Sequence, residues 1–304
     1  MEPQLKDKTP FKSGYASLIG RPNVGKSTLL NRLVAQKIAA MSAKPQTTRN
    51  KITGVVHLPG GQIVLVDTPG IHESTVKLNR AIVKASFSTY NDVDLILFLI
   101  DASKGFSQED EYVLQTLQGV STAKILILNK IDLVPKLELL GLMDEMHKRS
   151  LFAEIIPISA LKRDGLDQLV SLILKYLPEG PQYFPETMIT DCPEDFLIAE
   201  IIREKIIHQT HFEVPYAVAV VVEQVEESKS DVLVIDATVY TEKDSQKKIM
   251  IGEKGAMLKK VGSLARKEIE KRFAIKVYLN LFVKVKNHWR DNDRFIREFG
   301  YFHD

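Results

Sequence analysis

A glycine-rich stretch near the N-terminus carries the residue types that bind phosphate groups. Residues 20–28 read GRPNVGKST and match G-x-x-x-x-G-K-[ST], between an apolar run, YASLIG, and a helical pattern. Backbone N–H groups at such a turn face negative charge, Lys26 reaches the β and γ phosphates of a nucleotide, and the Ser27 hydroxyl holds Mg²⁺. We predict that the whole stretch contacts the nucleotide: Gly20, Arg21, Pro22, Asn23, Val24, Gly25, Lys26, Ser27 and Thr28.

A second stretch, DTPGIH at residues 67–72, closes an apolar run with a carboxylate and a glycine turn. In many P-loop proteins this arrangement senses the γ-phosphate. Ile71 stands where the best-known hydrolases of this kind carry a glutamine that orients the attacking water. An isoleucine side chain neither donates nor accepts a hydrogen bond, and a lone loop histidine such as His72 is more often a surface residue than a catalytic one. The group that orients the water is left open.

The tetrapeptide NKID at residues 129–132 follows a buried apolar run, so it lies at the carboxyl end of a strand, where open α/β sheets bind ligands. Guanine offers a ring N1–H and a 2-amino group, and the two oxygens of Asp132 can accept both hydrogen bonds. Adenine would leave that carboxylate unpaired, at a cost of about 1–3 kcal/mol. Asn129 and Lys130 would brace the loop and cover the ring. These motifs together predict GTP rather than ATP.

The order of these motifs resembles that of the translation-factor-related GTPases, over residues 15 to 177. The resemblance implies that a threonine of PQTTR, residues 45–49, closes over Mg²⁺ and the γ-phosphate; relatives with V-T-R favour Thr48, and Thr47 stays open. It also implies that the Ala160 backbone N–H, in the Ile-Ser-Ala stretch, meets guanine O6. The implied metal ligands are Ser27, Thr48 and Asp67. The implied catalytic residues are Lys26, Thr48, Asp67, Gly70 and Asn23. The implied further nucleotide contacts are Asp67, Thr68, Pro69, Gly70, Ile71, Asn129, Lys130, Asp132, Ser159 and Ala160.

A branch of these GTPases replaces the glutamine with a hydrophobic residue, and in some members an asparagine at the position of Asn23 helps to bind potassium. Our hypothesis is that Asn23 assists a K⁺ ion that occupies the place of an arginine finger. The alternative, that Asn23 only stabilises its loop, stays open. The expected cofactors are GTP or GDP, Mg²⁺ and, under this hypothesis, K⁺.

The C-terminal part carries a different kind of site. Residues 247–260 read KKIMIGEKGAMLKK, in which paired glycines let a backbone approach nucleic-acid phosphates and lysines attract them. Between residues 246 and 290, 13 Lys and Arg face 3 Glu, a net charge of +10 that leaves −8 for the rest of a chain whose total is +2. This asymmetry favours a polyanionic partner. The predicted RNA contacts are Lys247, Lys248, Ile251, Gly252, Glu253, Lys254, Gly255, Lys259 and Lys260.

The surrounding order of two strands, two helices and a strand looks like a type II KH domain, which binds about four nucleotides of single-stranded RNA. The first of these strands is expected over Tyr216–Gln224 and the helix after the glycines over Ala256–Phe273. The expected core stripe of this helix is Leu258, Val261, Leu264, Ala265, Ile269 and Phe273. Ile251 and Val261 are candidates for an apolar groove wall, but for each we favour a position in the structural core. For Trp289 we favour packing against the domain over stacking on a base.

These sites need elements to position them. From residue 15 to residue 176, β-branched apolar runs alternate with helical patterns, which predicts an α/β domain with a mainly parallel six-stranded sheet. The predicted helices lie near residues 26–36, 77–91, 108–118, 137–150 and 166–177. Prolines at 178, 181, 185 and 193 mark an extended connector. We predict a tail at 1–13, a GTPase domain at 14–177, a linker at 178–193 and an α+β KH domain with a C-terminal helix at 194–304.

This layout is similar to that of the Era family of GTPases over almost the whole chain. The resemblance implies a slow GTPase that binds the 3′ end of 16S ribosomal RNA, assists small-subunit (30S) assembly and associates in part with the inner membrane surface. Two rival classes remain: a GTP-dependent adaptor for protein or anionic lipid, and a tRNA-modification GTPase, for which no catalytic cysteine or cofactor-binding domain is seen.

The composition of the chain indicates the cellular compartment in which the protein works. A single cysteine, Cys192, excludes an intrachain disulfide and fits a reducing environment. The apolar stretches are far shorter than the roughly 20 residues that span a bilayer, and the charged N-terminus does not read as a secretory signal. We expect a cytoplasmic protein, with peripheral membrane association implied only by the resemblance.

Overall fold

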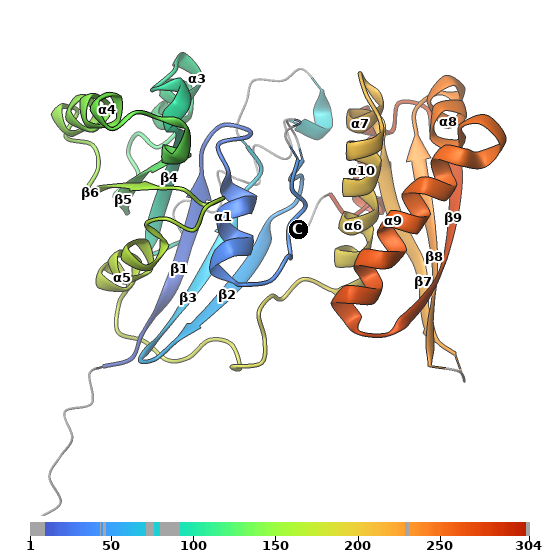
Figure 1. The fold of residues 1–304 in the computed structure, drawn as a ribbon, viewed down its shortest axis with the longest axis horizontal. Coiled ribbons are helices and arrows are strands. Elements are labelled where there is room, and N and C mark those ends of the chain that lie inside the picture. Colours follow the sequence, from blue (N-terminus) through green and yellow to red (C-terminus); the bar gives the residue numbers. More distant parts are fainter. Residues whose placement is uncertain are drawn as a thin grey trace, which may run out of the picture. The chain divides into compact units, whose positions relative to one another are not determined.

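The computed structural model describes residues 10–42, 44, 47–70, 76–79, 92–228 and 231–301. Backbone contacts divide them into two compact units (Figure 1). The N-terminal unit holds the described residues of 10–37, 51–70 and 92–191, and the C-terminal unit holds those of 38–50, 76–79 and 192–301. Two short segments, 38–50 and 76–79, thus pack with the C-terminal unit, although the predicted boundaries assign them to the GTPase domain. The predicted boundaries themselves stay a proposal.

The N-terminal unit is built on one sheet of six strands in the order β2-β3-β1-β4-β5-β6. All neighbours are parallel except β2, which is antiparallel to β3. Strands β3 and β4 are buried along their whole length, as their continuous apolar runs require. The strands are β1 (Lys12–Ile19), β2 (Ile52–Leu58), β3 (Gly61–Asp67), β4 (Leu95–Asp101), β5 (Ala123–Asn129) and β6 (Glu154–Ile158). The predicted fold class of this domain is confirmed.

Helices cover this sheet and begin close to the predicted positions. They are α1 (Lys26–Leu33), α3 (Gln108–Gln115), α4 (Lys136–Lys148) and α5 (Leu166–Tyr176). Most of the helix predicted over 77–91 lies outside the described residues. Because β1, β3, β5 and β6 are parallel within one sheet, their carboxyl ends lie at the same edge. The P-loop and the DTPG, NKID and Ile-Ser-Ala motifs each lie at one of these ends, whereas PQTTR lies between α1 and β2 in the sequence.

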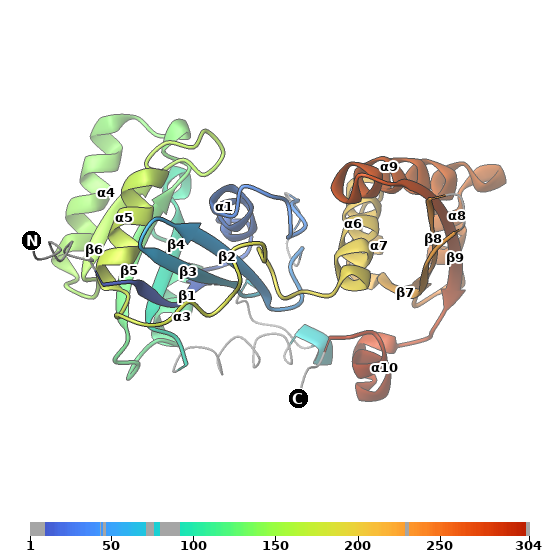
Figure 2. The same ribbon diagram turned by 90° about the horizontal axis from the view of Figure 1, so that it is seen from below.

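The C-terminal unit is a three-stranded sheet in the order β7-β8-β9, with β7 antiparallel and β9 parallel to β8. Its elements are α6 (Glu194–Gln209), α7 (Val214–Ala217), β7 (Ala219–Glu227), β8 (Val232–Thr241), α8 (Asp244–Ile251), α9 (Ala256–Phe273), β9 (Lys276–Val285) and α10 (Asp293–Glu298). Figure 2 shows α6 and α9 together on one face of the sheet. The strand expected from Tyr216 begins at Ala219 instead, because a short helix with proline in its first turn precedes it.

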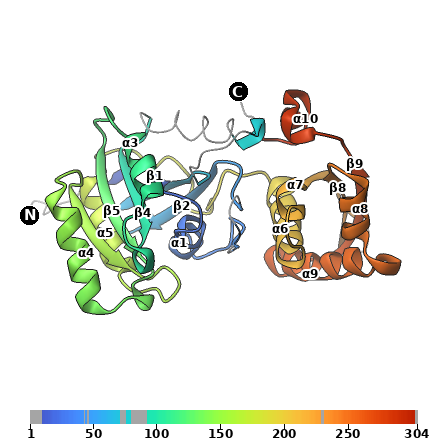
Figure 3. The same cartoon turned by 90° about the horizontal axis from the view of Figure 1, so that it is seen from above.

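Two apolar cores hold this unit together. The larger joins α6, α9 and the sheet, with Ile198, Ile235 and Val261 fully buried. The smaller surrounds Trp289, whose side chain has no exposed surface and whose Nε1–H donates to the Ala217 carbonyl at 2.9 Å. The expectation that this tryptophan packs against the domain is confirmed. Figure 3 shows α10, which contributes to the smaller core, on the side of the unit away from α9.

Among the described residues, no helix is both long enough and apolar enough to cross a bilayer.

Candidate functional site

The phosphate-binding loop is held in shape by its own lysine. Lys26 is buried, and its Nζ donates to the carbonyl oxygens of Gly20, at 2.8 Å, and Arg21, at 3.0 Å. Burial lowers the pKa of Lys26 to about 8, against the opposing effect of the negative charge of Asp67. The ammonium group therefore sits in a low-dielectric loop, where a phosphate would be strongly attracted and would favour the protonated form.

Two oxygen donors for a divalent cation lie next to this loop. The Ser27 hydroxyl donates to Asp67 Oδ2 at 2.6 Å, and the Asp67 side chain is fully buried at the end of β3. A hydroxyl and a carboxylate suit Mg²⁺, which prefers oxygen ligands and keeps phosphate and water in its shell. Among the described residues, no group of three or more His, Cys, Asp or Glu side chains could form an all-protein cage. The third implied ligand, Thr48, lies in the segment that packs with the C-terminal unit.

The DTPG turn closes onto the phosphate-binding loop. A Cβ added at Gly70 would lie 2.8 Å from Pro22 Cα, so only a glycine permits this contact. The Thr68 hydroxyl donates to the Leu18 carbonyl at 2.8 Å, which ties the end of β3 to β1, and Pro69 is buried beside it. Ile71 and His72 lie outside the described residues, and so does any group there that orients water.

The residues predicted to bind guanine are connected to the phosphate-binding loop through one buried side-chain amide, that of Asn129. Asn129 is 2% exposed; its Nδ2 donates to the Val24 carbonyl at 2.8 Å, and its Oδ1 accepts from the Ala160 N–H at 3.0 Å. A Cβ added at Gly25 would lie 2.2 Å from Asn129 Nδ2. Gly25, which also has φ of 105°, thus makes room for the amide that links three motifs from distant parts of the chain.

Lys130 and Asp132 extend this frame. Lys130 Nζ donates to the Asn23 carbonyl at 2.8 Å and to Asp101 Oδ2 at 2.7 Å, and Asp132 Oδ1 accepts from the Ser159 hydroxyl at 2.5 Å. Burial acts to raise the pKa of Asp101, but the hydrogen bonds from Lys130 and Ser103 hold it below its ordinary value. Sequence reasoning missed Asp101, although a carboxylate that ends a buried apolar run is a visible signal.

The structure therefore gathers the predicted phosphate, metal and guanine residues of the N-terminal unit at one sheet edge. Arg21 is buried within this frame, where its Nε donates to Asp110 Oδ1 at 3.0 Å. Val24 is fully buried, Thr28 is half-buried on α1, and the Asn23 side chain is exposed. Their assignment as nucleotide contacts stays a prediction.

The glycine pair of the C-terminal unit forms a sharp break between α8 and α9. Gly252 has φ of 73°, and a Cβ there would lie 2.7 Å from Met257 Cβ, whereas Gly255, with φ of 81°, faces open space. Lys247, in the middle of α8, and Ile251, its last residue, are half-buried. The other charged residues predicted to contact RNA are exposed: Lys248, Glu253, Lys254, Lys259 and Lys260.

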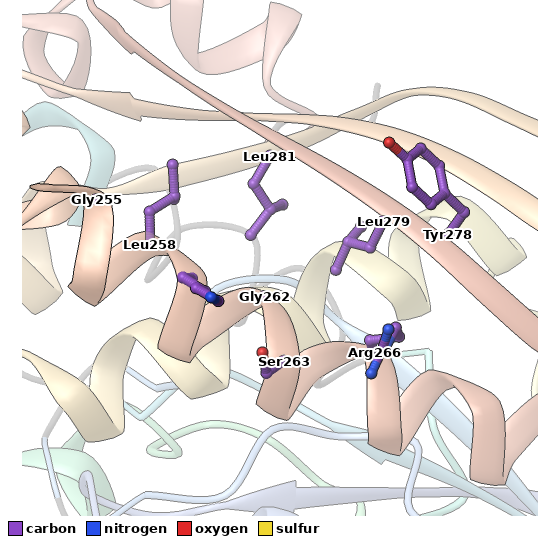
Figure 4. A pocket seen from close by; sticks show the side chains of 9 residues that line it. Gly255, Leu258, Gly262, Ser263, Arg266, Tyr278, Leu279 and Leu281 are labelled. Carbon is purple, nitrogen blue, oxygen red and sulfur yellow. The ribbon is translucent and has the colours of Figure 1, made fainter.

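A groove of about 380 Å³ begins at this break and runs between α9 and β9 (Figure 4). Of the predicted RNA residues, Gly255 and Lys259 line it. Sequence reasoning missed most of the rest of the lining: Gly262, Ser263, Arg266, Tyr278, Leu279 and Leu281. The small residues that follow the glycine pair along the helix were the available signal for Gly262 and Ser263.

Two residues of the expected core stripe have other positions. Leu258 is half-buried and lines the groove, and Leu264 is 37% exposed, whereas Val261 belongs to the core and not to the groove wall. A strict 3.6-residue stripe fails here because α9 divides its apolar face between the core and the groove.

A buried frame around a P-loop with NKID at a strand end defines a guanine-nucleotide-binding domain, and the second unit adds a GxxG groove. The family described as 50S ribosome-binding GTPase matches residues 15–130, and the KH domain family matches residues 213–290.

Whole-chain relatives make the assignment narrower. GTPase Era of Geobacter sp. (strain M21) is 52% identical over 291 residues, which cover 96% of this chain and 98% of that protein. The Era protein of Geobacter metallireducens is 50% identical over 293 residues, with coverage of 96% and 98%. The chain belongs to the Era family of GTPases.

Two solved structures are similar to the whole chain. One is Era in complex with MgGDPNP and nucleotides 1506–1542 of 16S ribosomal RNA, and it is 42% identical with a TM-score of 0.94. The other is a point variant of Aquifex aeolicus Era bound to GDP and AlF₄⁻, with the same identity and TM-score. Each alignment covers 96% of this chain and 100% of the other.

Proposed function

We propose that this GTPase is a switch that binds the 3′ end of 16S ribosomal RNA and assists assembly and maturation of the small (30S) ribosomal subunit. The observation that carries the proposal is the buried Asn129 amide, which holds the phosphate and guanine motifs together in a chain that also has a KH groove. The similar Era structure that contains a 16S ribosomal RNA fragment supports the choice of RNA.

In the nucleotide site, Lys26 and the loop N–H groups bind the β and γ phosphates, and Asp132 accepts the two guanine donors. Ser27, Asp67 and Thr48 would hold Mg²⁺, which neutralises phosphate charge when bound. The Gly70 turn would report the γ-phosphate. Calorimetry with GTP and ATP at equal magnesium tests this assignment: we expect heat with GTP only, and ATP that competes equally would overturn it.

Asn23 is proposed to assist a potassium ion beside the phosphates. Its side chain is exposed at a residue with φ of 65°, and the Asn23 carbonyl is already engaged by Lys130. The group proposed to act on the cation is the amide oxygen of the Asn23 side chain. Single-turnover GTP hydrolysis should be faster in potassium than in sodium buffer, and Asn23→Ala should remove the difference. Equal rates for the unaltered protein would remove the potassium hypothesis.

The groove in the C-terminal unit is the proposed RNA site. Lys259 lines it, whereas Lys267 is an exposed cation on the same helix outside its lining. Lys259→Glu should weaken binding of a single-stranded oligomer from the 16S 3′ end by about tenfold or more, and Lys267→Glu should change it much less. Equal effects of the two variants would indicate attraction to the general charge of the unit instead of binding in the groove.

We also propose that nucleotide and RNA binding are coupled through the segment 38–50. Arg49 is 3% exposed, and its guanidinium donates to the carbonyl oxygens of Val218 at 2.7 Å, Tyr216 at 2.9 Å and Pro215 at 3.2 Å. The neighbouring Thr48 is the implied Mg²⁺ ligand. A nucleotide that recruits Thr48 must therefore act on a segment that the C-terminal unit binds.

Other residues of this segment are held in the same way. Arg203 of α6 donates to the Thr47 carbonyl, and Lys44 Nζ donates to the Ile207 and Thr210 carbonyls at the end of the helix. The Met41 N–H donates to Glu204 Oε2 at 2.9 Å. Because these partners all belong to α6 or its C-terminus, release of the segment would change the surroundings of a helix that packs against α9, which forms one wall of the RNA groove.

Under this proposal the protein acts in the cytoplasm, and a fraction of it associates peripherally with the cytoplasmic face of the inner membrane. The fraction that sediments with the small subunit should fall for Lys259→Glu and stay for Lys267→Glu. Cell fractionation that finds the protein absent from both ribosomal and soluble fractions would contradict this placement.

A further inference from the structure

A second hollow lies next to the RNA groove in the C-terminal unit. Its volume is about 620 Å³, and it is lined by the end of α9, the turn that follows, the beginning of β9 and Val232 of β8. Two residues, Arg266 and Tyr278, line both the groove and this hollow. Figure 4 shows them together at the end of the groove away from Gly255. The two spaces thus share a wall.

The lining of the second hollow carries the groups that bind a nucleotide without reading its sequence. The Tyr278 side chain is 60% exposed, a large exposed fraction for an aromatic residue of a sheet. Arg266 and Lys276 supply two cations. The one carboxylate of the lining, Glu270, accepts a hydrogen bond from the Val277 N–H at 3.2 Å and faces Arg266 Nε at 4.0 Å, so its charge is partly offset.

We propose that this hollow binds the nucleotide of a single-stranded RNA that follows or precedes those in the KH groove, with its base stacked on Tyr278 and its phosphate on Arg266 and Lys276. A KH groove holds about four nucleotides, so a longer strand must leave it at one of its ends. Stacking on an aromatic ring tolerates any base, and a positively charged groove tracks the backbone. The inference rests on the proposed RNA-binding function of the groove and extends it.

The chain provides matched controls for this site. Phe282 is on the same strand, four residues from Tyr278, and is 52% exposed, but it lines neither space. Lys276 lines only the second hollow, so Lys276→Ala leaves the groove lining intact. Tyr278→Phe keeps the ring and removes the hydroxyl, which separates stacking from hydrogen bonding.

The experiment measures fluorescence anisotropy with RNA oligomers of four to seven nucleotides from the 16S 3′ end. For the unaltered protein, we expect affinity to rise by about tenfold when the strand grows from four to six nucleotides. Tyr278→Ala should remove most of that gain, and Tyr278→Phe and Phe282→Ala should keep it. Lys276→Ala should leave binding of the four-nucleotide oligomer unchanged and reduce the salt dependence for the longer one by a slope of about 0.7, the value for one phosphate.

Crosslinking gives an independent readout. An oligomer with a single 5-iodouridine placed beyond the four groove nucleotides should crosslink to Tyr278, identified by mass spectrometry. A length gain that Tyr278→Ala and Lys276→Ala leave intact, or that Phe282→Ala removes equally, would overturn the inference while the groove assignment stands. No binding of any four-nucleotide oligomer would overturn the proposed RNA function, and this inference with it.

Discussion

The nucleotide site and the RNA groove differ in how much of their polar chemistry is already engaged within the protein. Around the P-loop, Lys26, Asn129 and Asp67 are buried and hydrogen-bonded to neighbouring backbone or side-chain groups. Along the groove, the cations Lys259 and Arg266 are exposed above an apolar lining. A preorganised polar frame selects one ligand closely, whereas an open basic groove permits a flexible strand to adapt. Changes in the first region should therefore impair folding and binding together, and changes in the second should impair binding without destabilising the fold.

The largest expected effect comes from a single methyl group at the P-loop. In Gly25→Ala the new Cβ would lie 2.2 Å from Asn129 Nδ2, at a residue whose φ of 105° already strains any L side chain. We expect GTP affinity to fall by more than about a hundredfold and the free energy of unfolding to fall by at least about 2 kcal/mol. Calorimetry and chemical denaturation check both values. A variant that folds and binds normally would mean that Asn129 does not brace the loop.

Because Lys26 is buried, we predict that GTP affinity depends on pH, by about tenfold per pH unit above the pKa of this lysine. Lys26 has a pKa of about 8 in the protein, and bound phosphates would raise it, so nucleotide binding takes up a proton above that pH. GTP affinity should be flat just below pH 8 and should fall above it by up to about tenfold per pH unit.

Lys26 should also make the folding stability depend on pH, but stability should rise with pH where GTP affinity falls. Its pKa is lower in the folded protein than the ordinary value of 10.5, so the unfolded chain binds more protons between these values. The nucleotide-free protein should gain stability from this group as pH rises through that window. A GTP affinity that does not change between about pH 7.5 and about pH 9.5 would contradict the claim that burial lowers the pKa of Lys26.

Removal of the Arg49 side chain should separate the two regions functionally. Arg49→Ala leaves three carbonyl acceptors without their donor and should release the segment that carries Thr48. We expect the ratio of RNA affinities between the GTP and GDP states to shrink by about fivefold, towards one. Lys51→Ala, an exposed cation two residues further along the chain, should leave the ratio unchanged. A ratio that survives in Arg49→Ala would place the coupling elsewhere.

The smallest expected effect is a gain in stability, opposite in sign to the loss expected for Gly25→Ala. In Gly262→Ala the added Cβ would meet Leu281 Cδ1 at 3.4 Å, an ordinary contact, and alanine is favoured over glycine in a helix by about 1 kcal/mol. The free energy of unfolding should therefore rise by about 0.5–1 kcal/mol, while RNA affinity falls by about threefold because the groove narrows. Stability and affinity that change in the same direction would contradict the assignment of this face of α9 to the groove.

The same contrast explains what the sequence could predict. The nucleotide motifs are short, contiguous and placed at strand ends, so the sheet, its order of elements and the gathering of these motifs followed from local patterns. Helix α9 was predicted with its observed bounds, Ala256–Phe273, for the same reason. The wall of the RNA groove on β9 was missed because the run KVYLNLFVKV is apolar on one face and mixed on the other, and periodicity does not tell which face borders a ligand.

The position of the segment 38–50 could not be predicted from local pattern at all. It depends on Arg49 reaching the backbone carbonyls of residues 215–218, and every residue type supplies a carbonyl. Asp101 is an intermediate case: its place at the end of β4 was visible, but its partner Lys130 is 29 residues away in sequence. The residues of a contiguous motif can be predicted from the sequence, whereas contacts to backbone groups of distant segments are found only in the structure.

The most direct test of the account is the affinity of one RNA oligomer from the 16S 3′ end for the full chain, measured with a non-hydrolysable GTP analogue and with GDP. We predict that the two dissociation constants differ by about tenfold, and that RNA changes the ratio of the two nucleotide affinities by the same factor, since coupling is reciprocal. Equal RNA affinities in the two nucleotide states would show that the GTP site and the RNA groove act independently, and would contradict the proposed switch.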